Sequence, residues 1–152
     1  MTVTKKVKKS YQRKQRQFQI TDNGRKNQRK IGKIRGDLSE DFVNDLLVRL
    51  AGKAKILGFH RTTKEEDSKD HTDFVVYLLS GRKAGIQVKS SGYGAAKFKA
   101  EDQARQAGRG YPVITFVPNQ FAEKQTEEKR LMKELNGLES SLKKEDEICV
   151  NH

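Results

Sequence analysis

The segment that most constrains the fold is a nearly continuous apolar run, DFVVYLL, which begins at Asp73 and ends before Ser80-Gly81. Such a run between polar residues and a turn is typical of a central β-strand that is buried on both faces. The sequence KAGIQVK at 83–89 follows the turn and is expected to form the hairpin partner of this strand. The sequence therefore predicts a sheet with this hairpin near its centre.

Helices and further strands are expected on both sides of the hairpin, because apolar residues recur there at helical or strand spacing. The expected elements, in chain order, are a helix at 38–51 that begins with a capping box of Asp37 and Glu40, a strand at 55–60, a polar loop at 61–72, the hairpin, a helix at 95–108, a strand at 112–117 and a helix at 120–136.

The net charge of +12 is confined to the N-terminal end of the chain. Residues 1–35 carry thirteen Lys and Arg and one acid, whereas residues 36–152 carry nineteen of each sign. The first segment also has few apolar residues, so we expect it to be disordered in the free protein. A tail this basic favours an anionic polymer as partner, nucleic acid before a membrane surface. The prediction is one neutral domain over 36–152 with a basic, nucleic-acid-binding tail.

Several classes of protein are excluded by what the sequence lacks. No apolar run approaches the roughly 18 residues that span a membrane, and the N-terminus lacks the apolar stretch of a secretory signal. A single cysteine, Cys149, excludes an internal disulfide framework and a cysteine-based zinc site. We therefore expect an intracellular protein of the cytoplasm or nucleoid, with no membrane partner.

Three polar residues of the hairpin can share one face of the sheet. Side chains alternate between the faces of a strand, so Gln87 and Lys89 point the same way. With an odd-numbered connection such as Ser80-Gly81-Arg82, Asp73 stands opposite Lys89 and on the same face as both. A two-residue turn would instead place Asp73 on the other face.

The grouping is suited to metal-assisted phosphate chemistry. An Asp carboxylate and a Gln carbonyl are oxygen ligands of the kind that Mg²⁺ prefers. A lysine beside them can orient or deprotonate a water, or stabilise charge that develops on a phosphate. Glu40 could add a second carboxylate, although its place in a capping box also explains it. Taken singly, Asp73 can also simply end a loop, and Gln87 and Lys89 can face solvent.

The order of these elements resembles the PD-(D/E)XK nuclease superfamily over about residues 36–118. The resemblance lies in a helix, a strand, Asp73, thirteen intervening residues, Gln87-Val88-Lys89, and then a helix and a strand. It implies an α/β, restriction-endonuclease-like αβββαβ core, with a mixed central sheet flanked by helices. It also implies Mg²⁺-dependent nucleic-acid chemistry, in which the metal is held by Asp73, Gln87, Glu40 and the backbone carbonyl of Val88, and Lys89 is the catalytic lysine.

Two positions depart from the superfamily pattern. Thr72 stands where the motif has its proline, and Gln87 stands where it has an acid. The second change removes a negative charge, which should weaken metal binding. The Gln-x-Lys form resembles Mrr-type restriction enzymes and some homing endonucleases, so it does not by itself imply inactivity.

The favoured function is an endonuclease that hydrolyses DNA phosphodiester bonds with Mg²⁺ or Mn²⁺, with DNA favoured over RNA. Duplex cleavage suggests a homodimer, and a leucine seam in the helix at 120–142 is one possible interface, although core packing explains it better. The alternatives are a non-catalytic nucleic-acid-binding protein that retains the core, and a ribonucleoprotein component. Phosphate contacts are expected from Lys5, Lys6, Lys8, Lys9, Arg13, Lys14, Arg16, Arg25, Lys26, Arg29, Lys30, Lys33, Arg35, Ser90, Lys97 and Lys99.

Overall fold

The chain divides into two compact units, an N-terminal unit of Met1–Arg35 and a body of Gly36–His152. This computed structural model describes residues 3–150, with side chains for 22–106 and 108–150. The division between the units falls where the excess of basic residues ends. Each unit is described below by itself.

Helix α1 is much longer than the expected helix at 38–51, because it runs from Val3 to Gly52. Residues 3–35 are therefore helical in the structure, where the sequence suggested disorder. The predicted capping box is wrong, since Asp37 and Glu40 lie inside the helix. The physical reason is propensity: Lys, Arg and Gln have straight side chains that lose little freedom in a helix. The expectation of disorder rests on the shortage of apolar residues and leaves helix propensity out of account.

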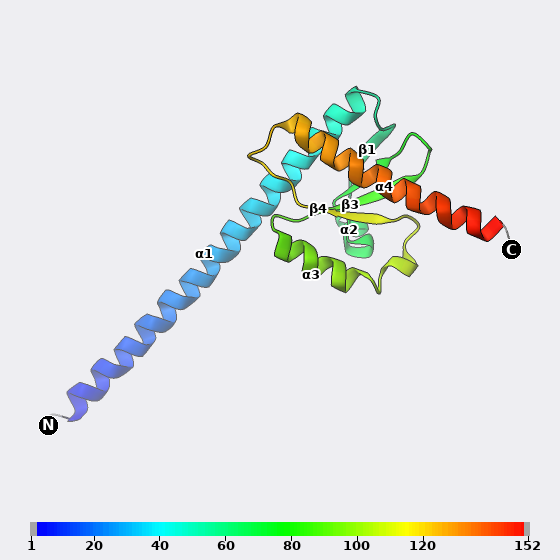
Figure 1. Cartoon of the computed structure of the whole chain (residues 1–152). Coiled ribbons are helices and arrows are strands. Elements are labelled where there is room, and N and C mark those ends of the chain that lie inside the picture. The colour runs from blue at the N-terminus through cyan, green and yellow to red at the C-terminus, as the bar shows by residue number, and fades with distance from the viewer. Residues whose placement is uncertain (1–2, 151–152) are drawn as a thin grey trace. The chain divides into compact units, whose positions relative to one another are not determined.

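The body is built on a four-stranded mixed sheet with the strand order β1-β2-β3-β4 (Figure 1). The pairs β1–β2 and β2–β3 are antiparallel, and β3–β4 is parallel. This confirms the α/β class and the mixed sheet flanked by helices. The strands are β1 (Gly58–Arg61), β2 (Phe74–Tyr77), β3 (Lys83–Val88) and β4 (Val113–Phe116), so the four predicted strands are present with shifted ends.

Three further helices connect and cover the strands. The expected loop at 61–72 contains a short helix, α2, which begins after a capping box formed by Thr63 and Glu66. The expected helix at 95–108 is divided into α3 and a single 3₁₀ turn, η1. The elements are α2 (Lys64–Asp70), α3 (Gly92–Asp102), η1 (Gln106–Gly108) and α4 (Lys124–Val150).

One face of the sheet carries the main core. Even-numbered strand residues such as Phe74, Val76 and Ile86 are fully buried, and they pack with apolar residues of α1 and α4. Leu131 and Leu135 on α4 are both fully buried in this cluster. These two leucines of the predicted seam therefore serve the core, as expected, and are not exposed for dimerisation.

The opposite face carries the odd-numbered strand residues and lies beside α3. Val75 and Gln87 are buried on this face, as are Ala95 and Phe98 on α3. The cation–π contact between Lys89 and Phe98 joins the end of β3 to this helix. The polar residues predicted to act together are therefore on the face away from the main core.

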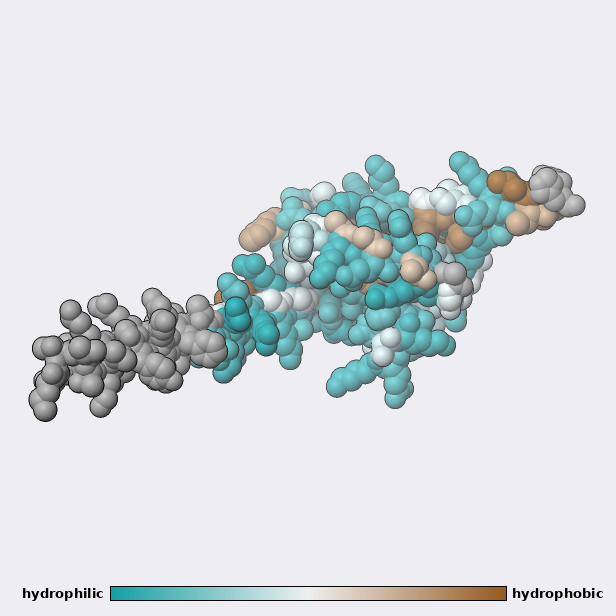
Figure 2. Space-filling view, turned by 90° about the horizontal axis from the view of Figure 1, so that it is seen from below, coloured by the Kyte–Doolittle hydropathy of each residue, from teal (hydrophilic) through white to brown (hydrophobic). Residues whose placement is uncertain are grey.

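The surface seen in Figure 2 is mostly hydrophilic. An apolar spot lies at the C-terminal end of α4, where Ile148 and Val150 are exposed. Within residues 3–150, no helix combines the length and the apolar character that crossing a membrane requires.

Candidate active site

Asp73 lies immediately before β2, and hydrogen bonds on both sides hold its backbone. Its N–H donates to the Ile86 carbonyl at 2.9 Å, and its carbonyl accepts from the Thr62 N–H at 3.0 Å. The Asp73 carboxylate Oδ2 accepts a hydrogen bond from the Val88 N–H at 2.7 Å. The Asp73 side chain is therefore directed at the end of β3, where the other predicted residues lie.

The hairpin register differs by two residues from the predicted one. Val75 pairs with Gly85, whereas the expected partner was Gln87. The reason is a connection of five residues, Leu78–Arg82, in place of three; it is closed by hydrogen bonds from Leu78 N–H to the Arg82 carbonyl and from Gly81 N–H to the Leu78 carbonyl. A shift of two residues keeps every side chain on its face, so the predicted grouping survives the wrong register.

Gln87 is buried on this face, with 7% of its surface exposed. Among the side chains that the structure describes, its carbonyl oxygen Oε1 is buried without a hydrogen-bond partner. An unsatisfied buried acceptor costs about 1–3 kcal/mol, so native structures rarely keep one without a reason. A cation bound at Oε1 would supply the missing partner.

Lys89 follows β3 directly and is half-buried. Its ammonium nitrogen lies 4.8 Å from the centre of the Phe98 ring on α3. Its positive charge also acts on Asp73, where it lowers the pKa of the carboxyl group. Lys89 and Asp73 therefore lie within electrostatic reach of each other.

Glu40 approaches the site from α1 and is held by an arginine that the sequence did not single out. Arg61, at the end of β1, donates from Nη2 to Glu40 Oε2 at 2.6 Å, and its Nη1 lies 3.5 Å from Asp41 Oδ1. The Glu40 carboxylate raises the pKa of Asp73, which places the two acids within electrostatic reach. Arg61 thus partly neutralises the acid that would be the second carboxylate of the site.

The pKa of Asp73 is raised from 3.8 to about 6. Burial is the largest cause, because it disfavours the charged carboxylate. The hydrogen bond from Val88 N–H opposes this shift, the negative charges of Glu40 and Asp67 add to it, and the charge of Lys89 opposes it. The site therefore favours a bound proton or cation at Asp73.

The donors in this cluster suit a hard cation such as Mg²⁺ in type. They are the Asp73 carboxylate and the orphaned Gln87 carbonyl oxygen, and the Glu40 carboxylate lies within electrostatic reach of Asp73. The Val88 group that contacts Asp73 is the N–H, so the expected carbonyl ligand remains a prediction. Within the described residues, no group of three or more His, Cys, Asp and Glu side chains could hold a metal ion. A metal centre here would therefore depend on the Gln87 amide as well as on carboxylates.

The residues expected to contact phosphates fall into three groups. On the described part of the N-terminal unit, Arg25, Lys26, Arg29, Lys30, Lys33 and Arg35 are exposed on α1. In the body, Ser90 is exposed just before α3, and Lys97 and Lys99 are exposed in the middle and the last turn of that helix. The third group lies outside the described side chains and consists of Lys5, Lys6, Lys8, Lys9, Arg13, Lys14 and Arg16.

Sequence reasoning also missed a buried polar cluster behind the site. Arg109 and Asp102 form a bidentate ion pair in which both side chains are almost fully buried. The Arg109 Nε also donates to the Asp70 carbonyl at 2.7 Å, and Tyr111 donates to the Asp70 carboxylate at 3.0 Å. These contacts join α2, α3 and the start of β4. No local sequence signal marks them, because the partners come together only in the folded chain.

Comparison with known proteins adds no identity: no family model, no curated protein and no solved structure matches this chain.

Proposed function

We propose that this protein is a Mg²⁺-dependent nuclease that hydrolyses DNA phosphodiester bonds on a restriction-endonuclease-like core. The proposal is supported above all by Gln87, whose buried carbonyl oxygen lacks a hydrogen-bond partner among the described residues, on the face that it shares with Asp73 and Lys89. An acceptor, a carboxylate of raised pKa and an ammonium group are the chemical parts that such a site needs.

Each residue has a distinct role in the proposed reaction. Asp73 and Gln87 hold the metal ion, and Glu40 adds the second negative charge when Arg61 releases it. The bound ion would polarise the scissile phosphate and lower the pKa of a metal-bound water. Lys89 orients the attacking water and stabilises negative charge that develops on the phosphate. The basic N-terminal unit supplies phosphate contacts that do not depend on sequence.

The test is a cleavage assay with the full-length protein, labelled DNA and either Mg²⁺ or Mn²⁺. Asp73→Asn and Lys89→Met should each reduce the cleavage rate by at least about 100-fold, as expected for groups that act on the reacting atoms. Lys83→Met is the matched control, because Lys83 lies at the other end of β3 and is exposed. It should cleave at the parent rate.

A specific feature also favours the non-catalytic alternative. Gln87 is neutral, and Arg61 already pairs with Glu40, so the site has little uncompensated negative charge to attract a cation. DNA binding without metal-dependent cleavage would support this alternative and overturn the proposed enzyme. Parallel assays with RNA of the same sequence decide between the two substrates.

A further inference from the structure

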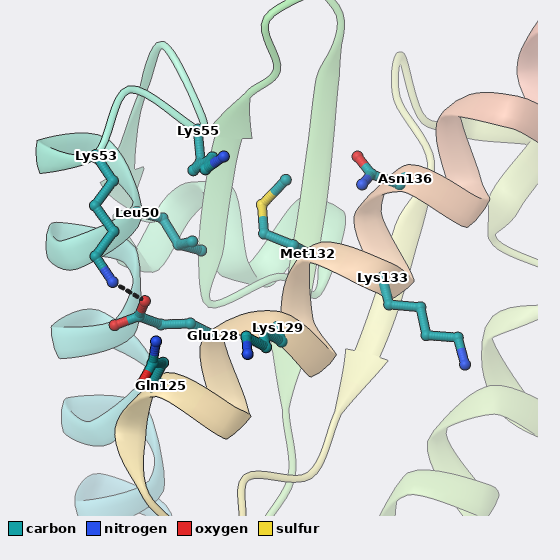
Figure 3. A pocket seen from close by; sticks show the side chains of 9 residues that line it. All are labelled: Leu50, Lys53, Lys55, Gln125, Glu128, Lys129, Met132, Lys133 and Asn136. Atoms are coloured by element: carbon teal, nitrogen blue, oxygen red, sulfur yellow. Dashed lines mark hydrogen bonds and ion pairs between the residues drawn. The ribbon is translucent and has the colours of Figure 1, made fainter.

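A hollow of about 580 Å³ lies in the body between the C-terminal end of α1 and the first half of α4 (Figure 3). We call it the basic hollow, because four lysines line it: Lys53, Lys55, Lys129 and Lys133. It is separate from the candidate active site, whose strand residues lie on the opposite face of the sheet.

Among the described residues, the only acid that lines the basic hollow is already paired. Glu128 accepts a hydrogen bond from Lys53 Nζ at 2.6 Å and another from Arg49 Nε. Burial opposes ionisation of Glu128, but the hydrogen bonds from Arg49 and Lys53 outweigh it and lower the pKa of the carboxyl. The Glu128 carboxylate is therefore ionised and is paired with two cationic side chains.

The other lysines of the basic hollow have no such partner. Within the part of the chain that the structure describes, Lys55, Lys129 and Lys133 form no ion pair with an acid. Figure 3 shows Lys55 at the end of the hollow near α1, and the Lys133 ammonium pointing away from Met132. Since residues 36–152 are neutral in sum, unpaired lysines around one opening are a local excess of positive charge.

The interior of the basic hollow is apolar. Leu50 is directed from α1 toward Met132 on α4, and Met132 packs against the main core (Figure 3). Gln125 and Asn136 also line it, and their amides can donate and accept hydrogen bonds. This lining therefore matches a ligand that combines an anionic group with a partly apolar group that has polar edges.

We propose that the basic hollow binds a nucleoside phosphate, with the phosphate at the lysines of its rim and the base against Met132 and Leu50. A hollow of about 580 Å³ lies within the usual size range of small-ligand sites. The nucleotide can be free or can be the 5′ end of a nucleic-acid strand. This site does not depend on the proposed nuclease activity.

The test is isothermal titration calorimetry of the full-length protein with AMP, inorganic phosphate and adenosine, each in a separate titration. AMP should bind about tenfold more tightly than phosphate or adenosine, because only AMP uses both the ion pairs and the apolar surface. The double variant Lys55→Gln/Lys129→Gln should bind AMP roughly threefold to tenfold more weakly, since each exposed charge pair contributes a modest factor. The control Lys143→Gln/Lys144→Gln removes the same charge from α4 outside the basic hollow and should bind as the parent does.

Two results would overturn this proposal. One is equal affinity for AMP and phosphate, which would indicate attraction to positive charge alone. The other is an equal loss of affinity in both double variants. An Asp73→Asn chain should bind AMP normally, which separates this test from that of the nuclease. Displacement of AMP by 5′-phosphorylated dT4, but not by the 5′-hydroxyl form, assigns the site to a strand end; failure of both to displace AMP assigns it to free nucleotides.

Discussion

At the scale of single residues, Asp73 links the stability of the fold to pH. Its pKa of about 6 lies above the ordinary 3.8, so the folded chain holds this proton more tightly than the unfolded chain does. The contribution of Asp73 to the free energy of unfolding is therefore fully present at low pH. It falls as the pH rises through about 4 to 6, and it is lost above that range. The size of the effect is on the order of 3 kcal/mol.

The measurement is urea denaturation of the parent and of Asp73→Asn, from about pH 4 to pH 8, without divalent cations. The variant should gain stability relative to the parent as the pH rises, and the gain should level off above about pH 6. If the difference in unfolding free energy between the parent and the variant is the same at every pH, the Asp73 carboxyl is not the titrating group.

A substitution at Gln87 should stabilise the metal-free protein and weaken its binding of Mg²⁺. Gln87→Met removes the unsatisfied buried oxygen, so the metal-free protein should gain about 1–3 kcal/mol in unfolding free energy. The same change should abolish any rise in melting temperature on addition of Mg²⁺. Thermal denaturation with Mg²⁺ and with EDTA measures both effects; a metal-free variant that is less stable than the parent would contradict the prediction.

At the scale of elements, the Asp102–Arg109 pair fastens α3 to the segment before β4. Asp102→Asn leaves the buried Arg109 charge without its partner and should cost about 3–5 kcal/mol in unfolding free energy. Asp146→Asn is the matched control, because Asp146 pairs with Arg82 at the surface. Its cost should stay below about 1 kcal/mol. Equal costs in chemical denaturation would show that burial of the pair has no effect.

The elements that the sequence predicted well are those with a hydrophobic pattern. The run from Asp73 and the segment at 83–89 became β2 and β3, because both strands lie inside the body and are buried on both faces along most of their length. α2 was missed because all its residues are polar and only its Thr63 cap marks it. The start of α1 was missed because propensity, rather than burial, sustains a helix there.

The candidate site was predictable only in part for a related reason. Any odd-numbered turn puts Asp73, Gln87 and Lys89 on one face, so this grouping could be predicted without the exact length of the turn. The register depends on the length of the turn, and the residue types at 78–82 do not determine that length. The pairing of Arg61 with Glu40 joins residues that are distant in sequence, and no local pattern reports such a contact.

At the scale of the whole molecule, general affinity for nucleic acid should reside in the N-terminal unit. Replacing Arg25, Lys26, Arg29, Lys30 and Lys33 by Gln keeps good helix formers but removes five exposed charges. The slope of log affinity for DNA against log salt should become shallower by about 0.9 for each phosphate that the variant no longer neutralises.

Salt titrations by fluorescence anisotropy measure this slope. The control carries five Gln replacements at exposed lysines of the body, namely Lys64, Lys69, Lys83, Lys143 and Lys144. A change of slope in the control as large as that in the test protein would assign the affinity to total charge rather than to the N-terminal unit.

The contact between Glu128 and Arg49 has a consequence for synthesis, because it joins residues that are 79 positions apart. α1 leaves the ribosome before α4, which supplies Leu131 and Leu135 to the same core. At about 5–20 residues per second, the apolar stripe of α1 waits roughly 4–16 s for these partners. During that interval the nascent chain presents the stripe to the cell, and chaperones that recognise apolar segments have their longest opportunity to bind it.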